Sequence, residues 1–220
     1  MIRSLPSLAL GAGAALLASC GDISAPLRSD IYEWRLTQGG DTLSYHWPRE
    51  ALPIRVWVQD TLDFATHAET AIDAWRHAFL YREFDAVVVS DSADADVIVR
   101  TGFPDGGGIL QKLVLRSTIT ECEALTELDL SFETRVLTLP IHVFMAARFD
   151  PELPETRACF GVAMRHELGH ALGIFRHSPD IGDIMYFSPE VTDLSERDRQ
   201  TAEVLYHAPV TVTTTRGGAP

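Results

Sequence analysis

The stretch His166–Ser178, HELGHALGIFRHS, places three histidines close together and decides what the rest of the chain must fold around. His166 and His170 are four residues apart, so on a helix they lie nearly above one another and both imidazoles can reach one metal ion. Glu167, next to the first histidine, projects beside such an ion rather than onto it, which is the place for a general base. The five residues HELGH therefore predict a helical metal site with an adjacent carboxylate.

A metal site that carries out chemistry needs a third protein ligand and one open position. Gly173 is suited to end the helix in a left-handed conformation and to turn the chain back toward the ion. Arg176 stands where the common HExxHxxGxxH pattern has its third histidine, but a guanidinium stays cationic and cannot ligate. His177 can ligate if the loop after Gly173 holds one extra residue, and Asp180 and Asp183 are the competing oxygen ligands.

Composition fits one soluble domain with a core of its own. The chain has 220 residues, 46% of them hydrophobic and 22% charged, as is usual for globular proteins. The formal net charge is −13, from 18 basic and 31 acidic side chains. An acidic surface repels phosphate backbones, so nucleic-acid binding is not expected.

The N-terminus has the pattern of an export signal. Residues 1–19 hold Arg3 and then a short apolar run ending in small residues, as in a secretory signal peptide. The run continues into Cys20 and resembles the lipobox of bacterial lipoproteins, which implies lipidation of Cys20 and anchoring in the cell envelope. Gly21 favours the outer membrane if the cell is Gram-negative. A soluble secreted protein is the alternative.

Two further cysteines, Cys122 and Cys159, could pair in an oxidising compartment. The sequence does not establish that the two residues come close enough, so the disulfide stays open. No surrounding pattern supports Cys159 as a catalytic nucleophile.

The order of predicted elements indicates an α+β domain. Residues 20–50 are interpreted as a tether and lead-in, 51–207 as the domain and 208–220 as a flexible tail. Alternating or β-branched runs predict strands at 53–60, 84–90, 96–101, 112–119 and 136–144. Apolar periodicity and capping residues predict helices at 65–80, 156–172 and 195–207.

Two weaker metal candidates lie outside the central stretch. Asp91, Asp94 and Asp96 could hold calcium, although a solvated acidic turn explains them as well. The remaining histidines lack ligand-like spacing and are expected at the surface or as satisfied buried residues; they are His46, His67, His77, His142 and His207.

The residues after the histidines add two further motifs. The segment 183–186, DIMY, places Met185 eight residues after His177, and His177 opens an HSxD run that ends at Asp180. Together with HELGH and Gly173, these motifs resemble the metzincin zinc peptidases and, among them, the matrixin-like enzymes. In matrixins the methionine also lies eight residues after the third ligand, so the resemblance implies that His177 is that ligand.

The resemblance implies a zinc ion on His166, His170 and His177, with Met185 as the hydrophobic floor beneath the ligands. It implies a metzincin-like zincin catalytic domain: a twisted mixed sheet with a helix packed on it, a metal-site helix and a C-terminal helix. The domain covers roughly residues 50–207, but the specific motifs lie only within 166–206. In the last helix three residues occupy matching places: Leu194, Asp198 and Tyr206.

This chain departs from the matrixin pattern in several ways. It has no cysteine-switch propeptide and no recognisable glycine- and aspartate-rich block, so thiolate latency and the family's structural zinc and calcium sites are not carried over. Phe187-Ser188-Pro189 replaces the usual Pro-x-Tyr wall of the specificity pocket. Tyr186 directly follows the methionine and is interpreted as a packing residue.

The expected activity is that of an envelope-tethered zinc endopeptidase. Zinc would lower the pKa of its water and stabilise the oxyanion, while Glu167 would move the proton to the leaving amine. The strand within 136–146 is the candidate edge for an extended peptide substrate. One alternative is a non-catalytic envelope lipoprotein that binds a peptide or protein. Another is a gluzincin-type enzyme, which would take its third ligand from Glu190, Glu196 or Glu203.

Overall fold

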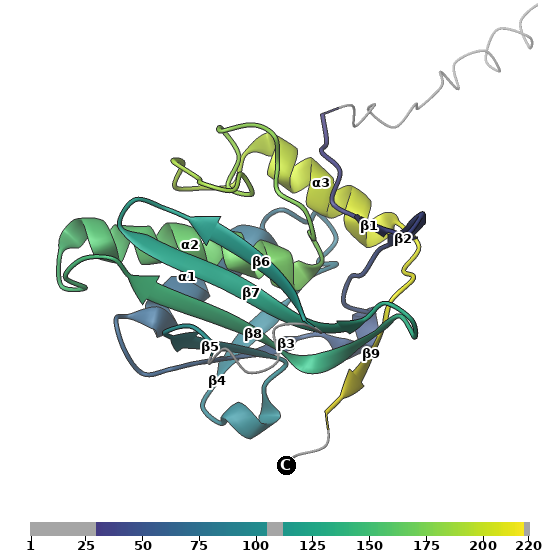
Figure 1. Ribbon diagram of the computed structural model, residues 1–220, viewed down its shortest axis with the longest axis horizontal. Helices are drawn as coiled ribbons and strands as arrows, with labels where there is room; N and C mark the ends of the chain where they lie inside the picture. The colour runs from purple at the N-terminus through teal and green to yellow at the C-terminus, as the bar shows by residue number, and fades with distance from the viewer. Residues whose placement is uncertain (1–29, 105–111, 218–220) are drawn as a thin grey trace, which may run out of the picture.

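The protein is a mixed α/β fold built on one large sheet (Figure 1). The computed structural model describes residues 30–104 and 112–217. The strands are β1 (Leu36–Gln38), β2 (Asp41–Leu43), β3 (Ile54–Val58), β4 (Ala86–Val89), β5 (Val97–Thr101), β6 (Leu113–Thr118), β7 (Cys122–Ser131), β8 (Val136–Ala147) and β9 (Thr213–Arg216). The helices are α1 (Phe64–Arg76), α2 (Pro154–Leu172) and α3 (Glu196–His207). This arrangement of a mixed sheet and a few helices is compatible with the predicted α+β class.

The main sheet is mixed, with strand order β4-β3-β5-β8-β7-β6. Strands β4, β3, β5 and β8 run parallel, whereas β7 runs antiparallel to both β8 and β6. Strand β9 pairs in parallel with the first part of β8, and β5 pairs with the later part. A separate hairpin joins β1 to β2.

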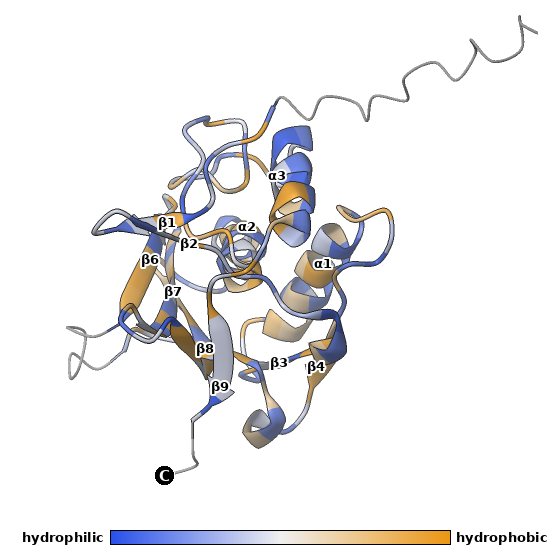
Figure 2. Ribbon diagram, turned by 90° about the vertical axis from the view of Figure 1, so that its right-hand side faces the viewer, coloured by the Kyte–Doolittle hydropathy of each residue, from blue (hydrophilic) through white to orange (hydrophobic). Residues whose placement is uncertain are grey.

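Helices α1 and α2 cover the same face of the sheet (Figure 2). The periodicity in the sequence predicts α1 correctly: Ala68, Ala71, Ile72 and Trp75 are buried. Trp75 donates its indole N–H to the carbonyl of Arg165 on α2 at 2.8 Å. Because the indole is buried and needs a partner, this bond fixes where the two helices meet.

The strand proposed as the substrate edge is not an edge. Strand β8, which contains residues 136–146, lies between β5 and β7, so both of its sides are already paired. The prediction is wrong because the sequence pattern did not indicate β7, which pairs with β8 along one of its two sides. Every second residue of β7 faces the core, but one of these is Thr126, so the strand lacks a continuous apolar pattern.

Both ends of the predicted domain extend further than expected. Trp34, Tyr45 and Trp47, in the supposed lead-in, are each at most 5% exposed, and Trp47 donates to the carbonyl of Ala171 at 2.8 Å. Residues 208–220, expected to be a flexible tail, contain β9 and the buried Val212. The domain therefore includes packed residues on either side of 51–207.

A disulfide joins Cys122 at the start of β7 to Cys159 on α2, with 6.0 Å between the Cα atoms. This resolves the open question about the two cysteines and removes Cys159 as a nucleophile. The bond ties the helix that carries the HELGH residues directly to the sheet.

The candidate calcium cluster is not supported. Asp96 is 6% exposed and pairs with the guanidinium groups of Arg55 and Arg216. Asp91 accepts the backbone N–H of Ala93 at 2.9 Å and caps a short 3₁₀ helix. A carboxylate held by two arginines is not available as a calcium ligand.

The predicted signal peptide, residues 1–19, and Cys20 lie outside the described residues. Within the part of the chain that the structure describes, no helix is long and apolar enough to cross a membrane.

Gly173 ends α2 for two separate physical reasons. Its φ of 116° lies in the left-handed region, as predicted, and its N–H closes the last turn on the carbonyl of His170. A Cβ at this position would also lie 2.0 Å from the carbonyl oxygen of Tyr45. The turn therefore requires a residue without a side chain.

We expect Gly173→Ala to lower the free energy of unfolding by about 3 kcal/mol or more, because backbone strain and a clash add together. Gly40→Ala is the matched control, because Gly40 has a φ of 90° but no atom within 4 Å of its Cβ position. This substitution should lower the free energy of unfolding by only about 1 kcal/mol. Urea denaturation measures both values. Equal losses would show that the contact with Tyr45 is unimportant.

Candidate metal centre

His166 and His170 lie on one side of helix α2, and both side chains are completely buried. Each ring gives its Nδ1 hydrogen to a backbone carbonyl: His166 to Ile184 at 2.7 Å and His170 to Ile174 at 2.6 Å. A carbonyl can only accept, so these bonds fix the tautomer and leave each Nε2 without a hydrogen. Both histidines are therefore prepared to offer an Nε2 lone pair.

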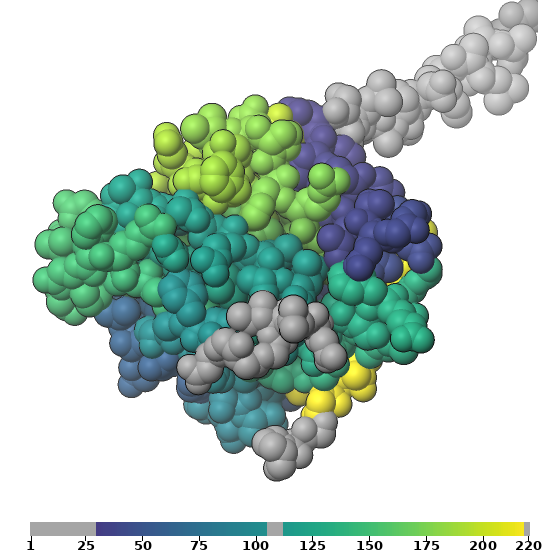
Figure 3. Space-filling model, viewed as in Figure 1, coloured from purple at the N-terminus to yellow at the C-terminus, as the bar shows by residue number. Residues whose placement is uncertain are grey.

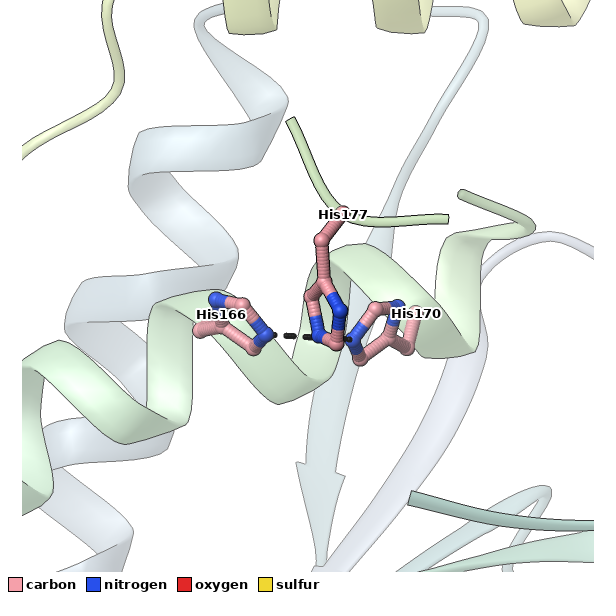
Figure 4. A group of neighbouring side chains, drawn as sticks. All are labelled: His166, His170 and His177. Atoms are coloured by element: carbon pink, nitrogen blue, oxygen red, sulfur yellow. Dashed lines mark hydrogen bonds between the residues drawn. The ribbon is translucent and has the colours of Figure 1, made fainter. Parts of the chain in front are cut away.

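His177 completes the group from the loop after Gly173 (Figure 4). In this loop Phe175 is buried and donates its N–H to the carbonyl of Trp34 at 2.8 Å. The next residue, Arg176, is exposed, and His177 turns back toward the helix. The loop thus contains the extra residue that the sequence requires, with Arg176 facing solvent.

The three Nε2 atoms converge on one point. The Nε2 of His170 lies 3.1 Å from that of His166 and 3.2 Å from that of His177. Two lone pairs this close repel each other unless a cation lies between them. Tetrahedral ligands at about 2.0–2.1 Å from a zinc ion are themselves separated by about 3.3 Å, so the spacing fits a bound metal ion.

Burial keeps these imidazoles neutral and able to ligate. Desolvation, together with the neighbouring His177, lowers the pKa of His166 to about 3. Desolvation and the two neighbouring rings lower the pKa of His170 well below its ordinary value, and desolvation lowers the pKa of His177. A metal ion therefore meets little competition from protons at neutral pH.

The methionine of DIMY packs closely against the helix that carries the two helical ligands. Met185 is fully buried, and its Sδ would be 2.3 Å from a Cβ built on Gly169, the residue before the second histidine. Only glycine leaves room for the methionine there. This contact explains the glycine in HELGH.

The loop from His177 to Met185 is held by α3 rather than by a metal. Asp183 is 1% exposed and accepts from Ser195 Oγ at 2.7 Å and from Arg197 Nε at 2.8 Å. Asp198 accepts the backbone N–H of Ile184 at 2.8 Å and also completes a capping box. Asp183, one of the competing ligands, is thus structural.

Asp180, the other competing ligand, pairs with Arg197 at 2.9 Å. Among the described residues, the only group of three or more ligand-type side chains is formed by His166, His170 and His177. Neither aspartate belongs to it, nor does any of Glu190, Glu196 and Glu203, which a gluzincin site would need. The other five histidines are also outside the group, but one ring nitrogen each of His67 and His142 is buried without a hydrogen-bond partner, so these two are not the satisfied residues that we expected.

Glu167 is completely buried, and both of its carboxylate oxygens have hydroxyl partners. Ser117 Oγ on β6 donates to Oε1 at 2.6 Å, and Thr126 Oγ1 on β7 donates to Oε2 at 2.7 Å. Desolvation raises the pKa of Glu167 to about 8, against the effect of these two bonds. Neither hydroxyl was predicted from the sequence. The only signal for each is a polar residue at an inward-facing strand position.

Strand β6 also contacts the segment after Met185. The N–H of Thr118 donates to the carbonyl of Phe187 at 3.0 Å, and the space-filling view shows the two segments in contact (Figure 3). Tyr186 packs against the ring of Phe187, with 4.9 Å between centroids. A groove of about 850 Å³ lies elsewhere, along α1 and β4, and none of the three histidines lines it.

The comparisons with known proteins identify no relatives. No protein-family model matches the chain, and no curated protein is significantly similar to it in sequence. The function must therefore be argued from the site itself.

We expect His177→Ala to lower zinc binding sharply, because two imidazoles remain where three converge. Arg176→Ala is the matched control, since this neighbouring side chain faces solvent, and it should bind zinc like the wild type. Metal analysis of dialysed protein and competition with a chelator measure the effect. Loss of zinc in Arg176→Ala with retention in His177→Ala would overturn the assignment.

Proposed function

We propose that this protein is a zinc-dependent endopeptidase of the matrixin-like metzincin type. The observation that carries the proposal is the convergence of three histidine Nε2 atoms, two of them from buried rings on α2, together with a buried glutamate next to the first histidine on that helix. Three nitrogen ligands with an open fourth position are the usual catalytic arrangement of zinc. The matrixin-like spacing from His177 to Met185 and the packing of Met185 against the helix that carries two of the ligands support the same class.

In this proposal His166, His170 and His177 hold the zinc ion through Nε2. The bound ion supplies Lewis acidity, lowering the pKa of a water toward 7 and polarising the substrate carbonyl. Glu167 takes a proton at its carboxylate and delivers it to the leaving amine. Burial raises the pKa of Glu167 to about 8 in the absence of a cation, and a bound zinc ion would lower it toward the range of a base.

The substrate is proposed to be an extended peptide. Strand β6 forms the sheet edge on the side of Glu167, so its outer side is the one offered to a substrate. The interior strand β8 cannot pair with a substrate. His177 is the partly exposed member of the histidine group, so access to the site runs past it.

One observation favours a second candidate, a non-catalytic zinc protein of the envelope. Glu167 and Ser117 have no exposed surface, and a base must reach the water that it deprotonates. A purely structural site, however, has no use for an adjacent carboxylate and normally takes a fourth protein ligand. The two candidates differ in whether zinc-loaded protein hydrolyses peptides.

We expect Glu167→Gln to keep one zinc per chain and to lower peptide hydrolysis at least about 100-fold, because a positioned base contributes about 10²–10⁴. Glu155→Gln is the matched control, an exposed glutamate on the same helix, and should be unchanged. The measurement is cleavage of a mixed-peptide library with and without a chelator. No chelator-sensitive cleavage by zinc-loaded wild type would favour the non-catalytic candidate.

We also propose that the protein is exported and anchored to the bacterial envelope by lipid on Cys20. The Cys122–Cys159 disulfide supports export, because such bonds persist in oxidising compartments. Two or more acyl chains give stable anchoring.

We expect Cys20→Ser to abolish incorporation of labelled fatty acid and to release the protein from the membrane fraction or leave it uncleaved. Cys159→Ser is a control, because it retains Cys20 and should keep the label. Unchanged labelling of the Cys20→Ser protein would refute lipidation at this residue.

A further inference from the structure

The proposed base has an unusual environment for a carboxylate. Glu167 is completely buried, as are the two residues that bond to its carboxylate, Ser117 and Thr126. In the residues that the structure describes, no lysine or arginine pairs with Glu167. Two hydroxyls alone therefore hold its orientation.

We infer that Ser117 and Thr126 are positioning residues, which together hold the Glu167 carboxylate in one orientation. The inference rests on the proposed function, because it assigns these hydroxyls to the work of the base. It goes beyond that function by naming two groups, on two different strands, that the metal-site helix depends on.

The strand register makes the arrangement rigid. Ser117 pairs with Ala124, and Thr126 with Leu115, so the two hydroxyl residues lie diagonally on the same face of the β6–β7 ladder. Each oxygen of the carboxylate has its own donor, at 2.6 Å and 2.7 Å. A carboxylate with both oxygens bonded cannot rotate without breaking a short, buried hydrogen bond.

The test compares Thr126→Val, which keeps the shape of the side chain but removes its hydroxyl, with Thr126→Ser, which keeps the hydroxyl. Ser117→Ala removes the other partner and provides a second variant if Thr126→Val folds poorly. Thr213→Val, the loss of an exposed hydroxyl on β9 of the same sheet, is the control. Each protein is analysed for zinc content, for kcat and KM, and by crystallography of its metal-free form.

We expect Thr126→Val and Ser117→Ala to bind zinc as the wild type does and to lose about 10- to 100-fold in kcat with KM unchanged. Thr126→Ser should stay within about threefold of the wild type. In the crystals, the Glu167 carboxylate should rotate or take two orientations in Thr126→Val but not in Thr126→Ser.

A carboxylate that keeps its wild-type orientation in both Thr126→Val and Ser117→Ala would overturn the inference, whatever the activity. An unchanged kcat in both variants would overturn it as well. Lack of hydrolysis by zinc-loaded wild type would refute the proposed function instead, and the crystallographic comparison would still decide whether the hydroxyls position Glu167.

Discussion

The structure depends on burying polar side chains of α2 without leaving them unpaired. His166, Glu167 and His170 are all fully buried, and a buried polar group without a partner costs about 1–3 kcal/mol or more. Helix α2 cannot satisfy them, because its own backbone groups are already bonded. The partners must come from outside the helix, and supplying them fixes much of the fold.

The two carbonyls that accept from the imidazoles illustrate this constraint. Ile174 lies just beyond the helix end, and its carbonyl reaches His170 because Gly173 turns the chain sharply. Ile184 reaches His166 only because its own N–H is held by Asp198 on α3. Helix α3 thus affects the histidine group indirectly, because it fixes the backbone segment that orients His166.

Some of this could be predicted from sequence and some could not. HELGH, Gly173, His177 and Met185 lie within one short stretch. Helix spacing and turn geometry predicted the roles of the first two, and the resemblance to matrixins implied those of the last two. The exclusion of Arg176 as a ligand followed from its charge alone. These features are local, and local rules govern them.

The missed features all depend on pairing between distant segments. Strand β9 exists because Thr213–Arg216 meets the first part of β8, across more than seventy intervening residues. Thr126 is polar although it faces inward. It occupies this position because its hydroxyl bonds to Glu167, forty-one residues away. A polar residue that breaks the pattern of a strand can thus mark the partner of a buried functional group.

The arrangement of charges and lone pairs favours chemistry over stability as the reason for this core. A buried carboxylate with a pKa of about 8 and crowded imidazole lone pairs both raise the free energy of the folded state, and apolar residues of similar volume would avoid both costs. A divalent cation among the three Nε2 atoms removes the two problems together: it satisfies the lone pairs and lowers the pKa of the nearby carboxyl group. The crowded imidazoles and the buried carboxylate thus both support the proposed metal site.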